Sequence, residues 1–331
     1  MTVIPEVGQP NPGANKSAPV ALSQCVAILV TWHPDLTVLQ RLMSKLLQQG
    51  VDVTVVDNGS SNQSDIAALI ASLAGQYSNK TENELPPATI TWLPWAENQG
   101  LAAGMNRGLS WATQHQYQLA WLFDQDSDLN DGFCRHMLSA WQSGCQLTEK
   151  LAALGPRLVD PETGRQTPFR RFRLSHRSDC KLPGSDDLYM ADFLISSGTL
   201  LSLSSLKEIG DMKVSYFIDN VDLEWCFRAL SHGWQILGCD RAQLLHNIGE
   251  ASNNPLVKRG VMVSHGPLRY YYSTRNRIHL RRQSYAPFDW VWRDHLRFLI
   301  KTAFLMATSQ RRAEYWRALW RARRDSRELR E

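Results

Sequence analysis

Closely spaced carboxylates at the end of an apolar run give this chain its clearest chemical signal. The run Trp121 to Phe123 leads directly into Asp124, Gln125 and Asp126, with Asp128 two residues further on. Asp124 and Asp126 flank one residue, so in an extended chain both side chains point the same way. Such a pair suits a hard divalent cation that also binds diphosphate oxygens. A solvated turn is the structural alternative for Asp-x-Asp at a strand end.

A second carboxylate group opens a predicted helix. Helical spacing runs from Val221 to His232 and stops at Gly233, which places Asp222 in the first turn. The helix dipole favours the ionised form of a carboxylate there, and an ionised carboxylate can take a proton from a hydroxyl group. Helix capping is the structural alternative for Asp219 and Asp222.

Short apolar runs alternate with helical patterns, which predicts an α/β fold with a mostly parallel sheet and helices on both faces. The expected strands are Cys25–Val30, Val51–Val56, Thr89–Leu93, Leu119–Phe123, Phe193–Thr199 and Ala242–Leu245, and the expected helices include Asp35–Gln49 and Leu101–His115. Ligands bind at the carboxyl ends of the strands in such sheets. Thr31, His33, Asp57 and Asp124 all fall at these ends, so one crevice can contain them.

Three glycines lie where a strand is expected to lead into a helix. At Gly100, Gly104 and Gly108 the backbone can approach a ligand, with its amides pointing outward. Gly100 and Gly104 are four residues apart rather than two, which excludes a dinucleotide fingerprint. The structural alternative is that the glycines are helix-packing contacts.

Composition bounds the remaining possibilities. A chain of 331 residues can form one large α/β domain with appendages. Its six cysteines show no CxxC spacing, which argues against a zinc site or a disulfide framework and favours reduced, intracellular thiols. Residues 1–20 contain proline and glycine without an apolar core, so they predict a flexible arm and not a signal peptide.

The end of the chain is strongly basic. Residues 269–331 contain sixteen Lys or Arg and six Asp or Glu, a net charge of +10 that leaves −6 for residues 1–268. Beyond Pro287 apolar residues recur at helical spacing beside a cationic stripe of Arg293, Arg297 and Lys301. Lys301 interrupts the apolar run before the roughly 20 residues needed to cross a bilayer. We expect a basic amphipathic extension that lies on a membrane surface, with a dimerisation helix pair, and thus a homo-oligomer, as the alternative.

The ordered set of motifs resembles the inverting family 2 glycosyltransferases, and is most similar to bacterial rhamnosyltransferases of O-antigen and cell-wall polysaccharide synthesis. It consists of Thr31-Trp32-His33, Val55-Val56-Asp57-Asn58-Gly59-Ser60-Ser61, Asn98 to Gly108, and Phe123-Asp124-Gln125-Asp126. The match runs from about Val26 to Arg277. The resemblance implies a glycosyltransferase A fold, a nucleotide-diphosphate sugar donor, and Mg²⁺ or Mn²⁺.

The resemblance also implies roles for single residues in donor binding. Asp57 corresponds to the contact with nucleobase and ribose, in a pocket lined by Thr31, His33 and Asn58. The donor loop corresponds to Asn98, Gly100 and Arg107, and the metal and diphosphate pair to Asp124 and Asp126. Gln125 replaces an acidic residue of some relatives, which should matter little because a middle residue points away from the metal.

For catalysis, the resemblance implies a base in the segment from Phe217 to Arg228. We expect Asp222 to be the general base, with Asp219 as the second candidate and Glu224 as a weaker third. Trp225 would stack on the acceptor sugar, with a core position as the alternative, and Ser197 and Gly198 would lie at the acceptor site. His246, after an expected strand, would complete the metal site.

The function that follows is transfer of L-rhamnose from dTDP-rhamnose to a saccharide or lipid-linked saccharide acceptor, in lipopolysaccharide or cell-wall synthesis. We expect a cytoplasmic protein, peripheral at the inner face of the bacterial plasma membrane. The expected domains are the arm 1–20, a catalytic domain 21–268 and the helical extension 269–331. Alternatives are another donor such as UDP-galactofuranose, and a nonenzymatic nucleotide or nucleic-acid binding protein. No RNA-recognition or helix-turn-helix signature is present, so we expect no nucleic-acid partner.

Overall fold

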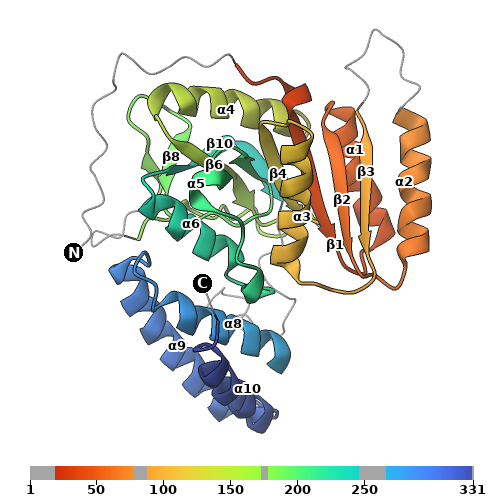
Figure 1. The fold of residues 1–331 in the computed structure, drawn as a ribbon. Coiled ribbons are helices and arrows are strands. Elements are labelled where there is room, and N and C mark those ends of the chain that lie inside the picture. The colour runs from red at the N-terminus through yellow and green to blue at the C-terminus, as the bar shows by residue number, and fades with distance from the viewer. Residues whose placement is uncertain (1–18, 78–87, 173–177, 246–265, 330–331) are drawn as a thin grey trace.

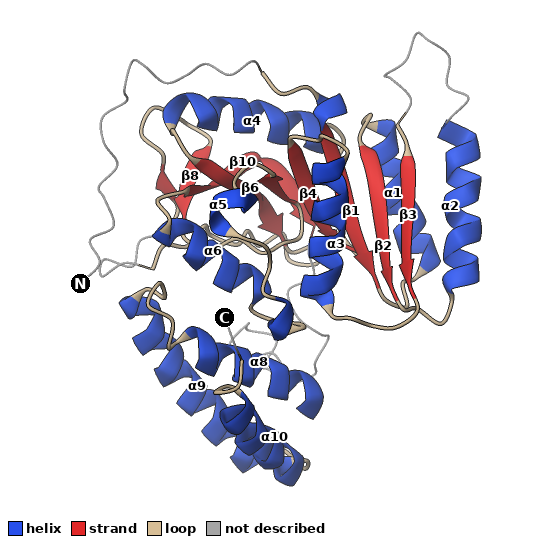
Figure 2. Cartoon of the chain, viewed as in Figure 1, coloured by secondary structure: helices blue, strands red, loops and turns tan. Residues whose placement is uncertain are grey.

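The structure is a computed structural model that describes residues 19–77, 88–172, 178–245 and 266–329. Its centre is a ten-stranded sheet with the strand order β3-β2-β1-β4-β9-β6-β10-β8-β7, in which β5 also pairs with β10. Helices cover both faces of this sheet, and a group of C-terminal helices lies to one side of it (Figures 1 and 2).

The first four strands form the parallel part of the sheet, as the apolar runs predict. They are β1 (Cys25–Thr31), β2 (Asp52–Asn58), β3 (Ile90–Trp95) and β4 (Leu119–Asp124). β1 and β4 are buried on both faces, which explains their nearly continuous apolar sequences. The chain adds β2 and β3 on one side of β1 and then β4 on the other side, so the connections diverge between β1 and β4. Ligands bind at the carboxyl ends of strands at such a switch point.

The second half of the sheet is mixed. Its strands are β5 (Asp128–Leu129), β6 (Leu151–Val159), β7 (Cys180–Lys181), β8 (Leu188–Ala191), β9 (Thr199–Ser202) and β10 (Gln235–Leu245). β6 and β10 are parallel, whereas β9 is antiparallel to β4 and β6, and β8 is antiparallel to β10. Because β9 is antiparallel to both β4 and β6, β6 and β10 run in the same direction as the first four strands, so the expected mostly parallel sheet is confirmed, with antiparallel strands added in its second half.

The strand expected over Phe193–Thr199 is wrong, because β9 begins only at Thr199. The preceding residues turn instead. Thr199 Oγ1 donates to Ile195 O at 2.6 Å, and the amide of Gly198 donates to Leu122 O at 2.7 Å. Gly198 has a φ of +76°, a conformation that disfavours other residues.

Two hydrophobic cores lie on the two faces of the sheet. One is formed with α1 (Leu36–Gln48), α2 (Gln63–Tyr77) and α4 (Phe133–Leu147), and the other with α3 (Leu101–Gln114), α5 (Leu206–Ile209) and α6 (Val221–Ser231). On α3 a side chain at Gly104 or Gly108 would collide with Val30 or Ile28 of β1. These two glycines thus let the helix pack closely on the sheet, in agreement with the structural alternative for them.

The basic extension forms three helices, α8 (Pro267–Leu280), α9 (Phe288–Thr308) and α10 (Arg312–Asp325). It packs against the second core: Trp290 of α9 is buried and meets Phe227 of α6 edge-on, with ring centroids 5.2 Å apart. α10 packs on α8, where Tyr271 Oη donates to Asp325 Oδ2 at 2.7 Å. Among the described helices, none has the length and apolar character required to span a membrane.

Candidate active site

The carboxylate run after β4 separates into two environments. Asp124 is the last residue of β4 and is partly buried, and Asp126 is exposed in the turn that follows. Asp128 instead forms a salt bridge with Lys45 at 2.5 Å, which ties it to α1. Asp124 and Asp126 are therefore the two carboxylates of this run that lie at the carboxyl end of the strand beside the switch point, apart from the ion pair of Asp128.

Gln125 joins the ends of β4 and β1. Its side-chain oxygen accepts the amide of Trp32 at 2.7 Å, and its side-chain nitrogen donates to Trp32 O at 3.2 Å. This amide-to-backbone pair fixes the loop after β1 against the loop that carries Asp124 and Asp126. Gln125 therefore has a structural part at the rim, and the expectation that its replacement of an acidic residue matters little for the metal stays a prediction.

The residues expected to line the donor pocket at β1 and β2 are buried. Asp57 has no exposed surface and accepts hydrogen bonds from Thr31 Oγ1 (3.0 Å), the amide of Ser60 (3.0 Å) and Gln63 Nε2 (2.7 Å). Thr31 is fully buried and Asn58 is 3% exposed. These side chains hold the two strand ends together in the structure. Their direct contact with a donor stays a prediction.

His33 is the exposed member of this group. Its φ of +47° turns the loop after β1, and the turn is held by a hydrogen bond from His33 N to Ser60 Oγ at 2.8 Å. The ring Nδ1 lies 3.1 Å from the amide of Ser61, and the exposed Trp32 packs beside it with centroids 4.8 Å apart. The loop after β1 thus presents two aromatic side chains at the switch point.

At the start of α3 the structure corrects the expected ligand contact of Gly100. A side chain at Gly100 would overlap Phe217, and the amides of Leu101 and Ala102 donate to Phe217 O at 2.6 and 3.4 Å. Because these amides already donate to another segment of the chain, they cannot donate to a phosphate in this structure. Gly100 permits the close approach of that segment.

Asn98 and Arg107, the other residues of the expected donor loop, have local partners. Asn98 Oδ1 accepts the amide of Gly100 at 2.8 Å, which shapes the turn. Arg107 donates to Pro94 O at 3.0 Å and stacks on Trp95 at 4.8 Å from the ring centroid, at the end of β3. Both lie at the carboxyl edge of the sheet, and their contact with a donor stays a prediction.

The segment before α6 has an unusual backbone. Phe217, Asp219 and Asn220 all have φ between +63° and +65°, a region that is costly for residues other than glycine. Asn276 of α8 stabilises this segment, because its Nδ2 donates to the carbonyls of Tyr216 (2.9 Å), Ile218 (2.8 Å) and Asp219 (2.9 Å). The strained segment brings the start of α6 to the sheet edge.

Asp222, in the first turn of α6, is partly exposed and lines a pocket. Burial raises its pKa to about 7. The charges of Asp124 and Asp219 act in the same direction, against the lowering effect of the amides of Leu223 and Ser196. Asp222 and Asp124 are thus near enough to repel each other, which brings the two carboxylate groups of the sequence to one place. The expectation that the helix dipole keeps Asp222 ionised is corrected, because burial outweighs it.

The two other base candidates differ from Asp222. Asp219 lines the same pocket, and its carboxylate is held by Arg269 at 3.1 Å. Glu224 is 1% exposed and is bound by Arg228 at 2.9 Å and by Tyr285 Oη at 2.6 Å. Glu224 is a buried partner of an ion pair, so its assignment as a third base candidate is wrong.

The expected acceptor residues are also buried. Trp225 is 1% exposed and its Nε1 donates to Gly210 O at 3.0 Å, so it is a core residue that cannot stack on a sugar. Ser197 is fully buried, with its hydroxyl 2.6 Å from that of Ser127. Gly198 lies against Pro156 in the turn before β9. Ser197 and Gly198 are thus buried in the turn before β9, and their place at the acceptor site stays a prediction.

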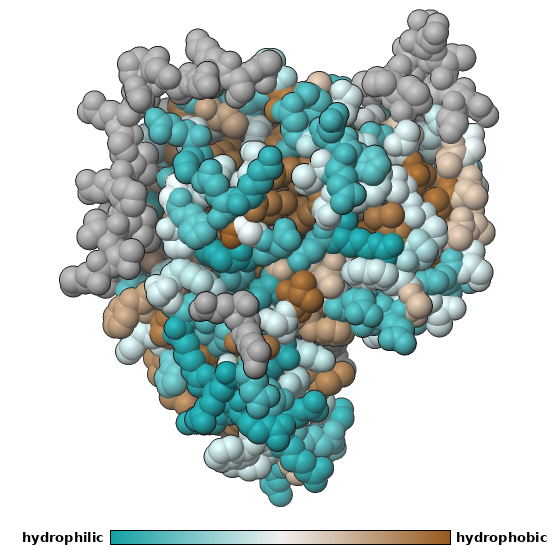
Figure 3. All heavy atoms as spheres, viewed as in Figure 1, coloured by the Kyte–Doolittle hydropathy of each residue, from teal (hydrophilic) through white to brown (hydrophobic). Residues whose placement is uncertain are grey.

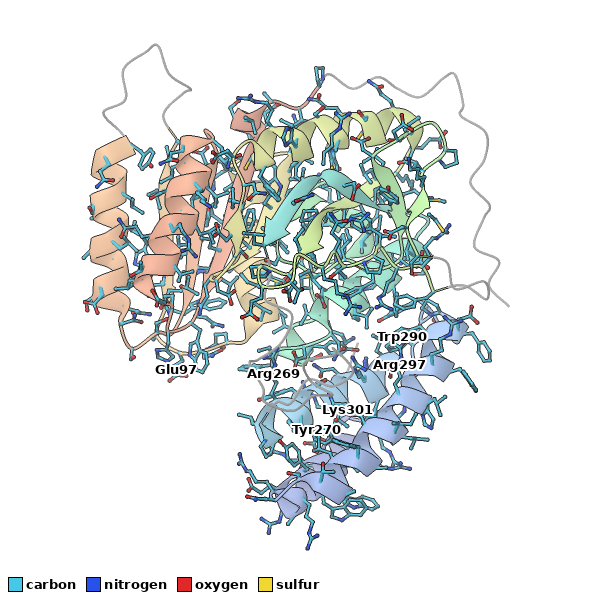
Figure 4. All side chains as sticks on the ribbon, turned by 180° about the vertical axis from the view of Figure 1, so that it is seen from behind. Glu97, Arg269, Tyr270, Trp290, Arg297 and Lys301 are labelled. Atoms are coloured by element: carbon cyan, nitrogen blue, oxygen red, sulfur yellow. The ribbon has the colours of Figure 1, made fainter. Side chains whose placement is uncertain are left out.

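A pocket of about 400 Å³ opens beside Asp222, between the second core and the C-terminal helices. Apolar side chains and several cations contribute to its wall. Figure 4 places Trp290, Arg297 and Lys301 of α9 at the junction with the α/β body. Arg170 and Arg277 also line it, and sequence reasoning did not single out Arg170.

The residues present fit a divalent cation in part. Asp124 and Asp126 supply the carboxylate oxygens that hard cations prefer, and the repulsion between Asp124 and Asp222 is of the kind that a nearby positive charge relieves. Over the described ranges, no group of three or more His, Cys, Asp or Glu side chains forms a ready metal site. His246, the expected third ligand, lies outside the described residues.

Asn276 is the functional residue that sequence reasoning missed. It lies in the run Tyr270 to Arg277, between Arg275 and Arg277. Arg275 is 9% exposed and donates to Asn276 Oδ1 and to carbonyls before α6, so it braces the strained segment together with Asn276. An amide between two arginines in a helix gives no local signal of such a role.

No protein-family model matches the chain. Its sequence is 27% identical over 297 residues to a dTDP-rhamnosyl transferase, RfbF, from Shigella flexneri, covering 88% of this chain and 92% of that protein. This sequence similarity confirms the resemblance that the motifs indicate.

Solved structures confirm the fold. A crystal structure of GalNAc-T7 with UDP, GalNAc and Mn²⁺ matches with a TM-score of 0.57 at 10% identity, covering 92% of this chain and 55% of the other. A structure of S. aureus TarS matches with a TM-score of 0.53 at 14% identity, covering 88% and 47%. The chain spans about half the length of both. It has the glycosyltransferase A fold expected from its motifs.

Proposed function

We propose that this chain, which has the glycosyltransferase A fold and is related in sequence to a dTDP-rhamnosyl transferase, is an inverting glycosyltransferase. Its proposed donor is dTDP-rhamnose and its proposed acceptor is a saccharide or lipid-linked saccharide of a bacterial surface polysaccharide. The proposed donor is that of the Shigella flexneri relative, of which this chain covers nearly the whole length.

One observation carries the proposal. Asp222 lines a pocket and at the same time interacts electrostatically with Asp124 at the end of β4. A transferase needs both features together, a carboxylate at an acceptor pocket and an anionic rim where a nucleotide diphosphate is bound. A nucleic-acid binding protein has no use for two carboxylates that oppose each other's charge.

In the proposed reaction Asp222 accepts the proton of an acceptor hydroxyl while that oxygen bonds to the anomeric carbon. The bond from this carbon to the donor diphosphate breaks on the opposite face, and the nucleoside diphosphate leaves with the electron pair. The configuration inverts in one displacement. A pKa near the working pH suits Asp222, because the base must be ionised before the step and protonated after it.

Asp124 and Asp126 are the residues that would hold Mg²⁺ or Mn²⁺, whose charge would offset that of the diphosphate. Gln125 keeps both carboxylates at the rim through its two hydrogen bonds with Trp32. The loops after β1 and β4 are thus fixed relative to each other before a donor binds, which reduces the ordering needed on binding.

A donor panel tests the function. Purified full-length protein is incubated with acceptor, Mg²⁺ or Mn²⁺, and separate nucleotide sugars, including dTDP-rhamnose, UDP-galactofuranose and UDP-GalNAc, and release of nucleoside diphosphate is measured. We expect release from dTDP-rhamnose. Release from another donor alone would replace the sugar and keep the reaction class, and no release from any donor in the presence of membrane-derived acceptors would contradict the transferase.

The second part of the proposal concerns the C-terminal helices, which we propose rest on an anionic lipid surface. Large side chains are exposed on α9 and α10, including Phe288 (78%), Trp292 (63%) and Trp320 (56%). Together with Arg282 and Arg323 they line a groove of about 680 Å³. Tryptophan beside arginine suits the interface between lipid and water. In Figure 3 the side of these helices toward the viewer is largely hydrophilic, with hydrophobic residues at its edges.

Sedimentation with vesicles tests this contact. We expect the protein to sediment with phosphatidylglycerol vesicles and much less with phosphatidylcholine vesicles, and a variant with Trp292→Ser and Trp320→Ser to stay in the supernatant. A dimer by light scattering that these two substitutions dissociate, without vesicle binding by the unchanged protein, would assign the surface to a second copy of the chain instead.

A further inference from the structure

The cationic stripe on α9 lies along a pocket, with its middle residue, Arg297, still exposed. Arg293, Arg297 and Lys301 are spaced by four residues, so they lie along one face of the helix. The sequence associates this stripe with a membrane surface, but in the structure all three side chains line the pocket that also contains Asp222 (Figure 4). The charged face of the helix therefore belongs to the candidate active site.

Two further cations complete this wall, Arg170 from the loop after β6 and Arg277 from α8. The cations oppose one another. Burial lowers the pKa of Arg170 and the charge of Arg297 lowers it further, and burial and the charge of Arg277 do the same to Lys301. Cations that repel one another in a partly buried pocket are stabilised when an anionic ligand binds between them.

The carboxylates in the pocket offset this charge only in part: the charge of Asp219 raises the pKa of Lys301, but burial and the charge of Arg277 outweigh it. Asp294 is 5% exposed and is bound by Arg277 at 2.6 Å and by Arg281 at 3.7 Å, and Asp219 is bound by Arg269 at 3.1 Å. Among the residues that the structure describes, Arg170, Arg297 and Lys301 form no ion pair. Apart from Asp222, the carboxylates of the wall are already engaged, while three cations are not.

We propose that this pocket binds a phosphate or diphosphate group of the acceptor, an inference that rests on the proposed function. Guanidinium groups fork onto phosphate oxygens, and an ammonium adds a point charge. The volume of about 400 Å³ lies in the range of small-molecule sites. Phe172, Phe193 and Trp290 line the same pocket and offer apolar surface to the group that carries the phosphate.

The position favours the acceptor over the donor. Asp222 lines the pocket, whereas Asp124 and Asp126, the proposed donor-side carboxylates, do not. A phosphate bound by α9 would thus lie beside Asp222, in a pocket to which the donor-side carboxylates do not contribute. The acceptor hydroxyl would then be held next to Asp222 by contacts remote from the reacting atoms, which is an effective use of binding energy.

Binding of inorganic pyrophosphate to the full-length protein tests the proposal. Calorimetric titration is done in EDTA, where the carboxylate rim has no cation to recruit an anion, for the unchanged protein, Arg297→Ala and Lys301→Gln. We expect each substitution to weaken binding roughly tenfold or more, as for the loss of a charged hydrogen bond. Arg317→Ala, which removes an exposed arginine of α10, is the matched control and should leave binding unchanged. Thermal unfolding of each variant establishes that it is folded.

Three outcomes would overturn the proposal. Pyrophosphate binding could be unaffected by both substitutions, or it could be weakened equally by Arg317→Ala. Saturating dTDP could also displace pyrophosphate, which would make the pocket part of the donor site. Geranyl diphosphate distinguishes the source of the phosphate. Tighter binding than pyrophosphate assigns the pocket to a lipid-linked acceptor, and equal binding assigns it to a soluble phosphorylated one. The titration requires no turnover, so loss of the proposed function in the donor panel would leave this result standing.

Discussion

The carboxylate of Asp222 interacts with that of Asp124 across the end of the sheet, although one lies on α6 and the other on β4. Each negative charge opposes ionisation of the other. Two buried or half-buried carboxylates with this relationship are rarely retained for stability alone, because the repulsion works against folding.

Replacement of Asp222 by Asn should remove transfer while donor binding remains. The amide keeps the shape of the side chain and cannot accept a proton, so we expect turnover to fall by roughly 10²- to 10⁴-fold, the usual contribution of a general base. Release of nucleoside diphosphate and calorimetric binding of dTDP measure the two quantities. Asp211→Asn, at an exposed site, is the control. A larger loss in Asp219→Asn than in Asp222→Asn would move the base to Asp219.

The pH dependence should follow Asp222. The base must be ionised and its pKa is raised to about 7, so kcat/KM should decline as the pH falls through about 7. Stability has the opposite sign. Because folding raises this pKa above the ordinary value of 3.8, the native state becomes less stable as the pH rises from about 4 to 7, and the loss persists above 7. Asp222→Asn should therefore unfold at a higher temperature than the unchanged protein at pH 8 and not at pH 4. A rate that is flat between pH 5 and pH 8 would speak against Asp222 as the base.

Chelation should abolish turnover, and Mg²⁺ or Mn²⁺ should restore it. Asp126→Asn should raise the cation concentration that gives half-maximal activity, because it removes one of two proposed ligands. Asp124→Asn should do the same. In EDTA, Asp124→Asn should also lower the pKa of Asp222, because the repelling charge of Asp124 is gone. The pH range over which Asp222 destabilises the native state should then end at a lower pH. Full activity in EDTA with dialysed substrates would exclude the cation.

Asn276→Ala should affect both stability and turnover. It removes the donor to three carbonyls of the strained segment before α6, so we expect a loss of about 1–3 kcal/mol in the free energy of unfolding. Urea denaturation measures this loss. The kcat should also fall, because this segment brings the start of α6, and with it Asp222, to the sheet edge. If Asn276→Ala lowers stability but leaves kcat unchanged, Asn276 contributes to stability and does not position Asp222.

Gly100→Ala should destabilise the protein by about 1–3 kcal/mol, the cost of a backbone conformation that other residues avoid. Its φ is +91°, and a side chain there would also displace Phe217 from the start of α3. Gly75→Ala is the matched control. Gly75 lies in α2 with open space at its Cβ position, so the substitution should stabilise by about 0.5–1 kcal/mol. Equal effects of the two changes would contradict the packing described for Gly100.

Local patterns predicted much of this molecule. Apolar runs located β1 and β4. The sequence also predicted that Asp124 lies at the end of a strand and Asp222 in the first turn of a helix, as the structure shows. Patterns of spacing do not reveal which neighbour a side chain meets. Trp225 and Glu224 follow Asp222 in sequence, yet both turn into the core because adjacent helical residues point about 100° apart. The position of Arg297 and Lys301 along the pocket depends on how α9 packs, which no local pattern contains.

α9 is turned so that Arg293 and Arg297 line the pocket beside the α/β body while Trp292, Leu296 and Leu299 are exposed. Under the proposals above, the chemistry of sugar transfer and the choice of acceptor depend on separate parts of the chain. Substitutions along one helix can adapt such an enzyme to a new recipient molecule and leave the sheet that carries Asp124 untouched.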